Sequence, residues 1–154
     1  DSFVFTDREV LHDHSHDYTE DLKFYPEVVV KPRTAEEIAL ILKLSNQERI
    51  PVTPRGAGTG LSGGALPVHG GIIISMERFN RIIEIDERNL QATVEPGVIN
   101  QVFQDEVMKK GLFYPPDPAS RGSCFLGGNL AECAGGPRQE RSGIAAPGVH
   151  RAGP

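Results

Sequence analysis

The stretch at residues 54–65, Pro-Arg-Gly-Ala-Gly-Thr-Gly-Leu-Ser-Gly-Gly-Ala, restricts what this chain can build more than any other part of it. Glycine reaches positive φ without steric cost and lets another group approach the backbone closely. A run of such residues can point several backbone N–H groups at one anion. Arg55 would add a permanent charge and a planar fork suited to phosphate oxygens. The stretch therefore predicts a phosphate-binding loop, with a flexible surface loop as the alternative.

Two common phosphate-binding frameworks do not fit this loop. Gly58, Gly60 and Gly63 match the spacing G-x-G-x-x-G of dinucleotide-binding folds, which require a helix immediately afterwards. The residues that follow, 64–71, contain Pro67 and three glycines and cannot form that helix. The Gly-Lys-Ser/Thr signature of nucleoside triphosphatases does not occur in the chain. We therefore reject both a nicotinamide-binding Rossmann fold and a P-loop.

A strand–helix–strand unit is predicted to lead into the loop. Residues 28–30 read as a short buried strand, and Thr34 with Glu37 matches the capping box that begins a helix. Ile38, Ile41 and Leu42 then follow at helical spacing, which indicates an apolar helix face and a helix running to Gln47. Residues 50–53 read as the next strand. Ligands of open α/β structures bind beyond the carboxyl ends of strands, where this loop lies.

The second half of the chain predicts more strands, one helix and two further loops. We expect strands at 72–75, 82–86 and 91–95, and a helix at 98–110 that ends before Gly111. The apolar face of this helix is predicted to contain Ile99, Val102, Phe103 and Val107. Three prolines stiffen residues 115–120, as a ligand-contacting wall or simply as a rigid turn. Two glycine pairs bracket a short helical stretch at 127–136, whose N–H groups could meet a phosphate or flavin oxygen.

Composition excludes several partners. A net charge of −5 argues against a nucleic-acid partner. No apolar run is long enough to span a membrane, and the N-terminus has no signal-peptide pattern. Cys124 and Cys133 lack the spacing of a redox or zinc site and are expected to be packing residues in a reducing, cytoplasmic compartment. The alternating His12, His14 and His16 could hold a metal, but we expect a solvated surface segment and no metal site.

Four stretches occur in the order typical of one family, namely residues 54–65, 94–98, 116–120 and 127–136. Over residues 11–138 the chain resembles the N-terminal FAD-binding domain of FAD-linked oxidases of the vanillyl-alcohol-oxidase (PCMH) type. Within that family it is similar to the branch of glycolate oxidase FAD subunits and D-lactate dehydrogenases. The resemblance implies an α+β fold in which FAD is held between two subdomains, the second of them truncated here.

The resemblance also implies which residues bind the cofactor. Residues in the first loop would wrap the FAD diphosphate: Arg55, Gly56, Ala57, Gly58, Thr59, Gly60, Leu61 and Ser62. Residues of the later loops would line the same cofactor: Pro96, Gly97, Pro116, Asp117, Pro118, Ser120, Gly127, Gly128, Asn129, Ala134 and Gly135. Relatives that attach flavin covalently through the first loop carry histidine where this chain has Thr59, so we expect noncovalent FAD.

The activity implied is oxidation of a small 2-hydroxy acid, glycolate or D-lactate, by hydride transfer to flavin N5. The substrate would bind through a cap domain that this chain lacks, and the parent enzyme could also contain an iron–sulfur subunit. No residue can be assigned as the catalytic base, and the fragment alone is expected to be inactive. A non-catalytic flavin- or nucleotide-binding module of a larger complex is the rival hypothesis.

The ends of the chain depart from the family pattern. We expect a polar N-terminal segment at 1–27, a partial FAD-binding domain at 28–138 and an irregular tail at 139–154. The tail lacks strand alternation and suggests truncation or an altered reading frame near Gln139. The chain begins at Asp1 rather than Met, which suggests a trimmed or processed product. Strands missing from the second subdomain would leave open sheet edges, through which two copies could form a homodimer.

Overall fold

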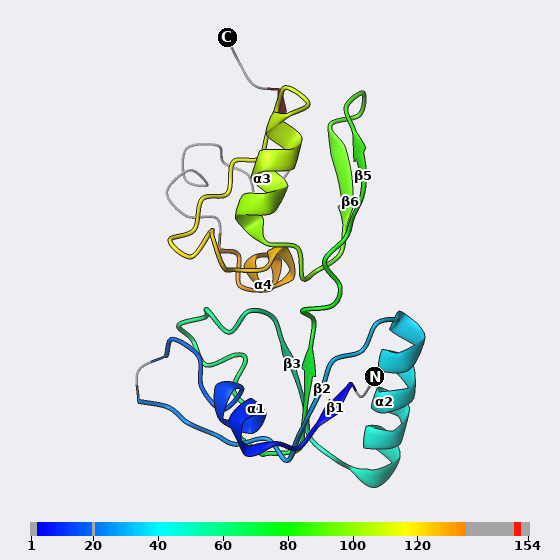
Figure 1. Ribbon diagram of the computed structural model, residues 1–154, viewed down its shortest axis with the longest axis vertical. Coiled ribbons are helices and arrows are strands. Elements are labelled where there is room, and N and C mark those ends of the chain that lie inside the picture. The colour runs from blue at the N-terminus through cyan, green and yellow to red at the C-terminus, as the bar shows by residue number, and fades with distance from the viewer. Residues whose placement is uncertain (1–2, 20, 135–149, 152–154) are drawn as a thin grey trace. The chain divides into compact units, whose positions relative to one another are not determined.

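The computed structural model describes residues 3–19, 21–134 and 150–151, which form a mixed α/β fold (Figure 1). The chain divides into two compact units, unit 1 at Asp1–Phe79 and unit 2 at Asn80–Pro154. Each unit has its own group of buried apolar side chains. Among the described residues, the longest helix has 14 residues, and no helix has the length and apolarity that a membrane crossing needs.

Unit 1 contains a four-stranded sheet in the order β1-β2-β4-β3. Its strands are β1 (Val4–Phe5), β2 (Val28–Val30), β3 (Val52–Arg55) and β4 (Ile72–Ser75). Strands β2 and β3 both run parallel to β4, placing Val29 and Thr53 on either side of Ile73, and β1 pairs antiparallel with β2. Strand β4 is buried along its whole length, as expected for the central strand of a parallel sheet.

Two helices accompany this sheet, α1 (Arg8–Asp13) and α2 (Ala35–Glu48). The predicted N-cap of α2 is confirmed, because the Glu37 amide donates to Thr34 Oγ1 at 3.3 Å, whereas the Glu37 carboxylate accepts from Arg33, one residue before the cap, at 2.7 Å. Ile38 and Ile41 of α2 pack against the apolar core, whereas Leu42 is exposed, contrary to the predicted face. Ser45 takes the buried position, because its hydroxyl donates to the Ile41 carbonyl within the helix and is thereby satisfied.

The connection between β3 and β4 consists of residues 56–71 and contains no helix. These two strands are parallel neighbours, so the connection returns the chain to the starting end of the sheet. Its last residue, Gly71, is buried with φ +74°. The Gly71 amide donates to the Glu27 carboxylate, and the Glu27 amide donates to the Gly71 carbonyl at 2.9 Å.

Unit 2 contains a hairpin, two helices and a two-stranded pair. The hairpin joins β5 (Ile82–Asp86) to β6 (Gln91–Val94), and α3 (Asn100–Met108) and β7 (Leu112–Phe113) follow. Helix α4 (Leu126–Ala131) comes next, and β8 (His150–Arg151) pairs antiparallel with β7. The core consists of Val98, Phe103, Val107, Leu112, Tyr114 and Leu126.

Helix α3 differs from its prediction in bounds and in its buried face. It begins at Asn100 rather than Val98, because a turn occupies the preceding residues and the Val98 amide donates to the Glu95 carbonyl. Its buried residues are Asn100, Phe103, Gln104 and Val107. The predicted Val102 is instead 46% exposed. The amide side chains of Asn100 and Gln104 therefore lie on the buried face of α3, which apolar periodicity alone had assigned to apolar residues.

The predicted irregular tail lies almost entirely outside the described residues. Of residues 139–154, the structure describes only His150 and Arg151, which form β8. The domain boundaries at 27 and 138 stay predictions.

Candidate functional site

The glycine loop, residues 56–65, follows β3 directly. Gly58 and Gly63 have φ of +70° and +73°, in the left-handed region that glycine adopts without strain. Within the described part of the chain, no amide from Gly56 to Ser62 donates to a protein acceptor, whereas the Gly63 amide donates to Thr19 Oγ1 at 2.8 Å. Consecutive amides without an internal acceptor are the donors that a phosphate group requires. The loop therefore has several backbone donors that an anionic ligand could use.

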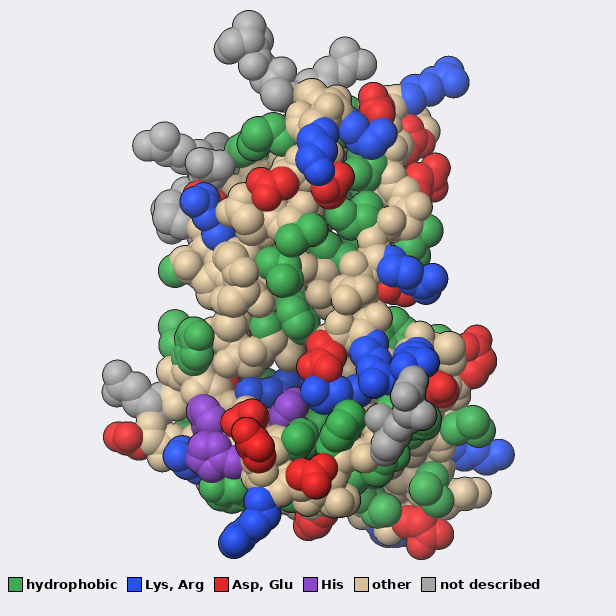
Figure 2. Space-filling model, in the orientation of Figure 1, with side chains coloured by type: hydrophobic (Ala, Val, Ile, Leu, Met, Phe, Trp, Pro, Cys, Tyr) green, Lys and Arg blue, Asp and Glu red, His purple; other side chains and the backbone are tan. Residues whose placement is uncertain are grey.

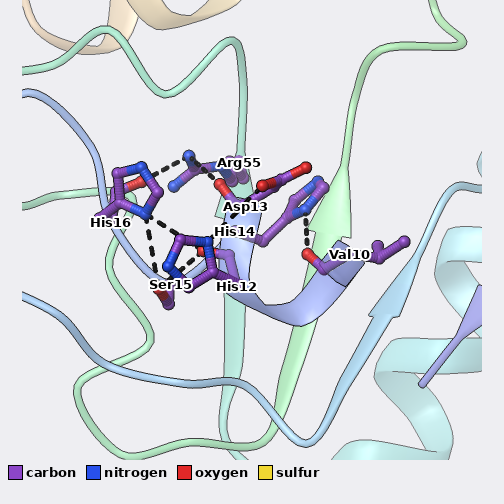
Figure 3. Close-up of polar contacts among 7 residues, drawn as sticks. All are labelled: Val10, His12, Asp13, His14, Ser15, His16 and Arg55. Carbon is purple, nitrogen blue, oxygen red and sulfur yellow. Dashed lines mark hydrogen bonds and ion pairs between the residues drawn. The ribbon is translucent and has the colours of Figure 1, made fainter. Parts of the chain in front are cut away.

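The side chain of Arg55 turns inward beneath this loop. Only 7% of it is exposed, and Nη2 donates to the His16 carbonyl at 2.7 Å and to the Asp13 carbonyl at 3.4 Å. Nη1 donates to the Ala65 carbonyl at 3.4 Å. Figure 3 shows the guanidinium reaching the backbone of the segment that bears the three histidines. Arg55 was predicted as a phosphate contact, and the structure shows its guanidinium bound to backbone carbonyls of its own unit.

The segment at residues 12–19, expected to be solvated, packs against the glycine loop instead. Ser15 and Asp17 are buried, and the Tyr18 amide donates to the Gly60 carbonyl at 3.1 Å. Figure 3 shows its three histidines close to one another, and Figure 2 shows histidine side chains in purple beside acidic side chains in unit 1. His12 is exposed, and its ring centroid lies 5.4 Å from that of His16. Among the described residues, no three His, Cys, Asp or Glu side chains are placed to hold a metal ion.

Charge beneath the loop is partly balanced. Burial lowers the pKa of the Arg55 guanidinium, and the negative charge of Asp17 opposes this shift. One Asp17 oxygen, Oδ1, accepts the Thr19 amide at 2.8 Å, while Oδ2 is buried and has no hydrogen-bond partner among the described residues. Burial also lowers the pKa of His14, whose Nδ1–H donates to the Val10 carbonyl at 2.8 Å. Unit 1 therefore contains a buried arginine whose positive charge is partly offset by the negative charge of Asp17.

In unit 2, two of the predicted loops are joined backbone to backbone. The Gly127 amide donates to the Pro96 carbonyl at 2.8 Å, and the Leu126 amide donates to the Val98 carbonyl at 2.9 Å. A Cβ on Gly127 would lie 2.6 Å from the Pro96 Cβ, so only glycine allows this approach. Backbone hydrogen bonds therefore hold the turn at Pro96 and Gly97 against the start of α4.

Buried amides connect the third loop to the other two. Asn100 is 0% exposed, and its Nδ2 donates to the Pro116 carbonyl at 3.3 Å. Gln104 donates to the same carbonyl at 2.7 Å. Asn129 donates through Nδ2 to Asn100 Oδ1 at 3.1 Å and to Cys124 Sγ at 3.3 Å. This amide network fixes the proline loop and α4 to α3.

Glu95 anchors the turn that contains Pro96 and Gly97. Its carboxylate accepts from the Arg81 amide at 2.8 Å and from the Arg81 guanidinium Nε and Nη2 at 3.0 and 2.7 Å. These hydrogen bonds lower the pKa of Glu95, so the carboxylate stays charged at neutral pH.

Comparison with known families identifies the chain. Residues 26–152 match the family model described as FAD binding domain. The chain belongs to this family. The match begins before β2 and extends across both units. The predicted FAD-binding family is therefore confirmed.

Relatives of this FAD-binding domain include flavin-linked enzymes. It is 44% identical over 131 residues to the glycolate oxidase subunit GlcD of Bacillus subtilis (strain 168), covering 85% of this chain and 28% of that protein. It is 39% identical over 144 residues to the D-lactate dehydrogenase of Anaerostipes hadrus, covering 91% of this chain and 30% of that protein. The chain thus spans less than a third of the length of either relative.

A solved structure shows the same fold. A structure of alkyldihydroxyacetonephosphate synthase matches with a TM-score of 0.81 at 24% identity, over 92% of this chain and 31% of that one. The predicted α+β fold of the PCMH type is therefore confirmed.

The predicted cofactor residues fall into two groups in the FAD-binding domain. Unit 1 contains Arg55, Gly56, Ala57, Gly58, Thr59, Gly60, Leu61 and Ser62. Unit 2 contains Pro96, Gly97, Pro116, Asp117, Pro118, Ser120, Gly127, Gly128, Asn129 and Ala134. Asp117 forms an ion pair with Arg121 at 2.9 Å, and Ala134 donates its amide to the Asn129 carbonyl at 2.8 Å. Gly135 lies outside the described residues. The cofactor role of each residue stays a prediction.

Sequence reasoning missed Asn100, Gln104 and the loop-contacting segment at residues 12–19. Asn100 and Gln104 lie on the same helix face as Phe103 and Val107, at the spacing of successive turns. A search for amides as well as apolar residues at that spacing would have found them. No pattern in residues 12–19 indicates burial, because that segment is polar throughout.

Proposed function

We propose that this chain is the FAD-binding part of a flavin-dependent 2-hydroxy-acid dehydrogenase that acts on glycolate or D-lactate. Membership of the FAD-binding family supports the cofactor, and the names of the relatives support the substrate class. The structural observation that carries the proposal is the run of amides from Gly56 to Ser62 without internal acceptors in the described chain. When bound, FAD supplies the two-electron chemistry, and the protein supplies binding and orientation.

The glycine loop is proposed to bind the diphosphate of FAD. Its amides present several hydrogen-bond donors, which suits two linked phosphates better than an uncharged ring. The left-handed φ of Gly58 also turns the backbone at a position where a side chain would be strained. The loops at Pro96, Pro116 and Gly127 are proposed to bind the same cofactor by their family positions.

This proposal predicts that affinity depends on the diphosphate. Titration of the purified 154-residue chain with FAD, followed by flavin fluorescence, should show saturable binding at micromolar concentrations or below. Riboflavin carries the same ring without the diphosphate and its attached adenosine, and it should bind at least about a hundredfold more weakly, a loss of about 3 kcal/mol. Equal affinity for the two flavins would contradict a diphosphate loop.

A flavin-reduction assay separates the enzyme from a non-catalytic flavin module. In the full-length parent protein, glycolate or D-lactate should bleach the absorption of bound flavin. Flavin that binds tightly but is reduced by neither acid would favour the module.

Attachment of FAD is proposed to be noncovalent, because Thr59 stands where covalently flavinylated relatives carry histidine. A threonine hydroxyl is a poorer nucleophile than an imidazole nitrogen at neutral pH. Acid precipitation of the flavin-loaded chain should therefore leave all of the flavin in the supernatant. Yellow colour retained in the washed pellet would show a covalent bond and would contradict this assignment.

A further inference from the structure

We infer that Arg55 is a positioning residue, which braces the glycine loop against residues 12–19 instead of contacting phosphate. The inference rests on the proposed function only in taking the loop as the diphosphate site. It changes the role assigned to Arg55, which directly precedes the glycine loop, and it makes residues 12–19 a structural part of the site.

The hydrogen bonds of Arg55 join three separate stretches of chain. The residue itself ends β3, its Nη1 reaches Ala65 at the far end of the loop, and its Nη2 reaches Asp13 and His16. Arginine suits this task because its planar fork holds several donors in fixed directions. All three acceptors are backbone carbonyls, so substituting the side chains of those three residues would leave the acceptors in place. One guanidinium thus connects both ends of the loop to the N-terminal segment.

Gly58 shows that the loop backbone lies directly against this guanidinium. A Cβ built on Gly58 would come within 2.2 Å of Arg55 Nη2 and 2.7 Å of Cζ. A side chain at this position would therefore displace either the guanidinium or the loop. Arg55 can therefore occupy its inward position because Gly58 has no Cβ.

Two further hydrogen bonds hold the middle of the loop to the same segment. The Tyr18 amide donates to the Gly60 carbonyl at 3.1 Å, and the Gly63 amide donates to Thr19 Oγ1 at 2.8 Å. Together with the Arg55 contacts, they bind the loop at its start, middle and end. The amides of Gly56 to Ser62 are not used in these contacts. The brace therefore sets the loop shape while leaving its donors to the ligand.

The first test measures hydrogen–deuterium exchange of the FAD-free chain. In Arg55→Lys, which keeps the charge but loses the fork, the hydrogen-bonded amides of residues 12–19 and of Gly63 in the loop should exchange about tenfold faster than in wild type. Amides of α2 and β4 should be unchanged, which distinguishes loss of the brace from general destabilisation. Arg88→Lys, in the exposed turn of the β5–β6 hairpin, is the matched control and should alter neither segment. Unchanged exchange in Arg55→Lys, together with lost FAD affinity, would show a direct phosphate contact and overturn the inference.

The second test keeps Arg55 and replaces Gly58, whose backbone lies against the guanidinium. Gly58→Ala should weaken FAD binding about tenfold or more and speed exchange in residues 12–19. Gly111→Ala is its control, because Gly111 has nearly the same φ, +68°, but a Cβ there would meet no atom within 4 Å. In the Arg55→Lys background Gly58→Ala should cost less, because the clashing Nη2 is gone. The inference would be contradicted if the effects of Gly58→Ala and Arg55→Lys on FAD binding were fully additive. It would also be contradicted if amide exchange in Gly58→Ala matched that of wild type. If the wild-type chain binds no FAD, the proposed function fails, while the exchange results still decide the role of Arg55.

Discussion

Asn100→Leu should lower the free energy of unfolding by about 3 kcal/mol, because it removes the centre of a buried amide network. Asn100 is fully buried and both donates to the Pro116 carbonyl and accepts from Asn129. Leucine has the same branching but a larger volume, so the loss comes from hydrogen bonds and overpacking and not from a cavity. Asn129 keeps its contact to Cys124 Sγ, and Pro116 keeps that to Gln104, which limits the cost.

The loss of unfolding free energy caused by Asn100→Leu can be measured by denaturant titration of the FAD-free chain. The neighbouring Gln101→Leu is the control, because Gln101 lies on the same helix and its side chain donates to Asp105 Oδ1 at 2.8 Å at an exposed position. We expect the control to change the free energy of unfolding by less than about 0.5 kcal/mol. The Asn100 variant should also bind FAD more weakly, since the proline loop and α4 lose their common anchor. Equal unfolding midpoints for the two variants would refute the assigned importance of the network.

Gly71→Ala should be still more damaging, by about 4 kcal/mol. Gly71 has φ +74°, and a Cβ there would lie 2.2 Å from the Pro51 carbonyl oxygen. That oxygen already accepts the Ile72 amide at 2.9 Å, so it cannot move without disturbing the start of β4. Strain in the left-handed region and a backbone clash therefore add at one buried position.

Gly111→Ala separates these two costs. It shares the left-handed φ but meets no neighbour, so it should cost only the conformational penalty of about 1 to 2 kcal/mol. The difference between the two alanine variants, from thermal or denaturant unfolding, measures the clash with Pro51. Indistinguishable stabilities would mean that the backbone around Pro51 relaxes at no cost.

Local signals in the sequence were sufficient for much of unit 1. The capping box at Thr34 and the apolar spacing of Ile38 and Ile41 predict α2, because these signals act within one or two turns of helix. The glycine loop also follows β3 as predicted. The four loop motifs identify the family because their glycines allow backbone conformations that other residues avoid and their prolines fix φ.

Tertiary contacts could not be predicted in the same manner. An arginine next to a glycine run resembles a phosphate contact, and nothing near it in sequence indicates the His16 carbonyl that it binds. Asn100 and Gln104 are polar, so an apolar-face search omits them, although the carbonyl of Pro116 satisfies both in the core. In each case the partner lies many residues away, and burial becomes favourable only when that partner is present.

The link between β3 and β4 has a consequence for how this site can be altered. Parallel neighbouring strands need a connection of about a dozen or more residues, and residues 56–71 serve as that connection here. The glycine loop, the proposed diphosphate site, is therefore also part of the crossover of the sheet. Deleting residues to abolish binding would shorten the only path by which the chain returns to start β4. Any ancestor or engineered variant must keep the length of this loop even if it gives up the cofactor.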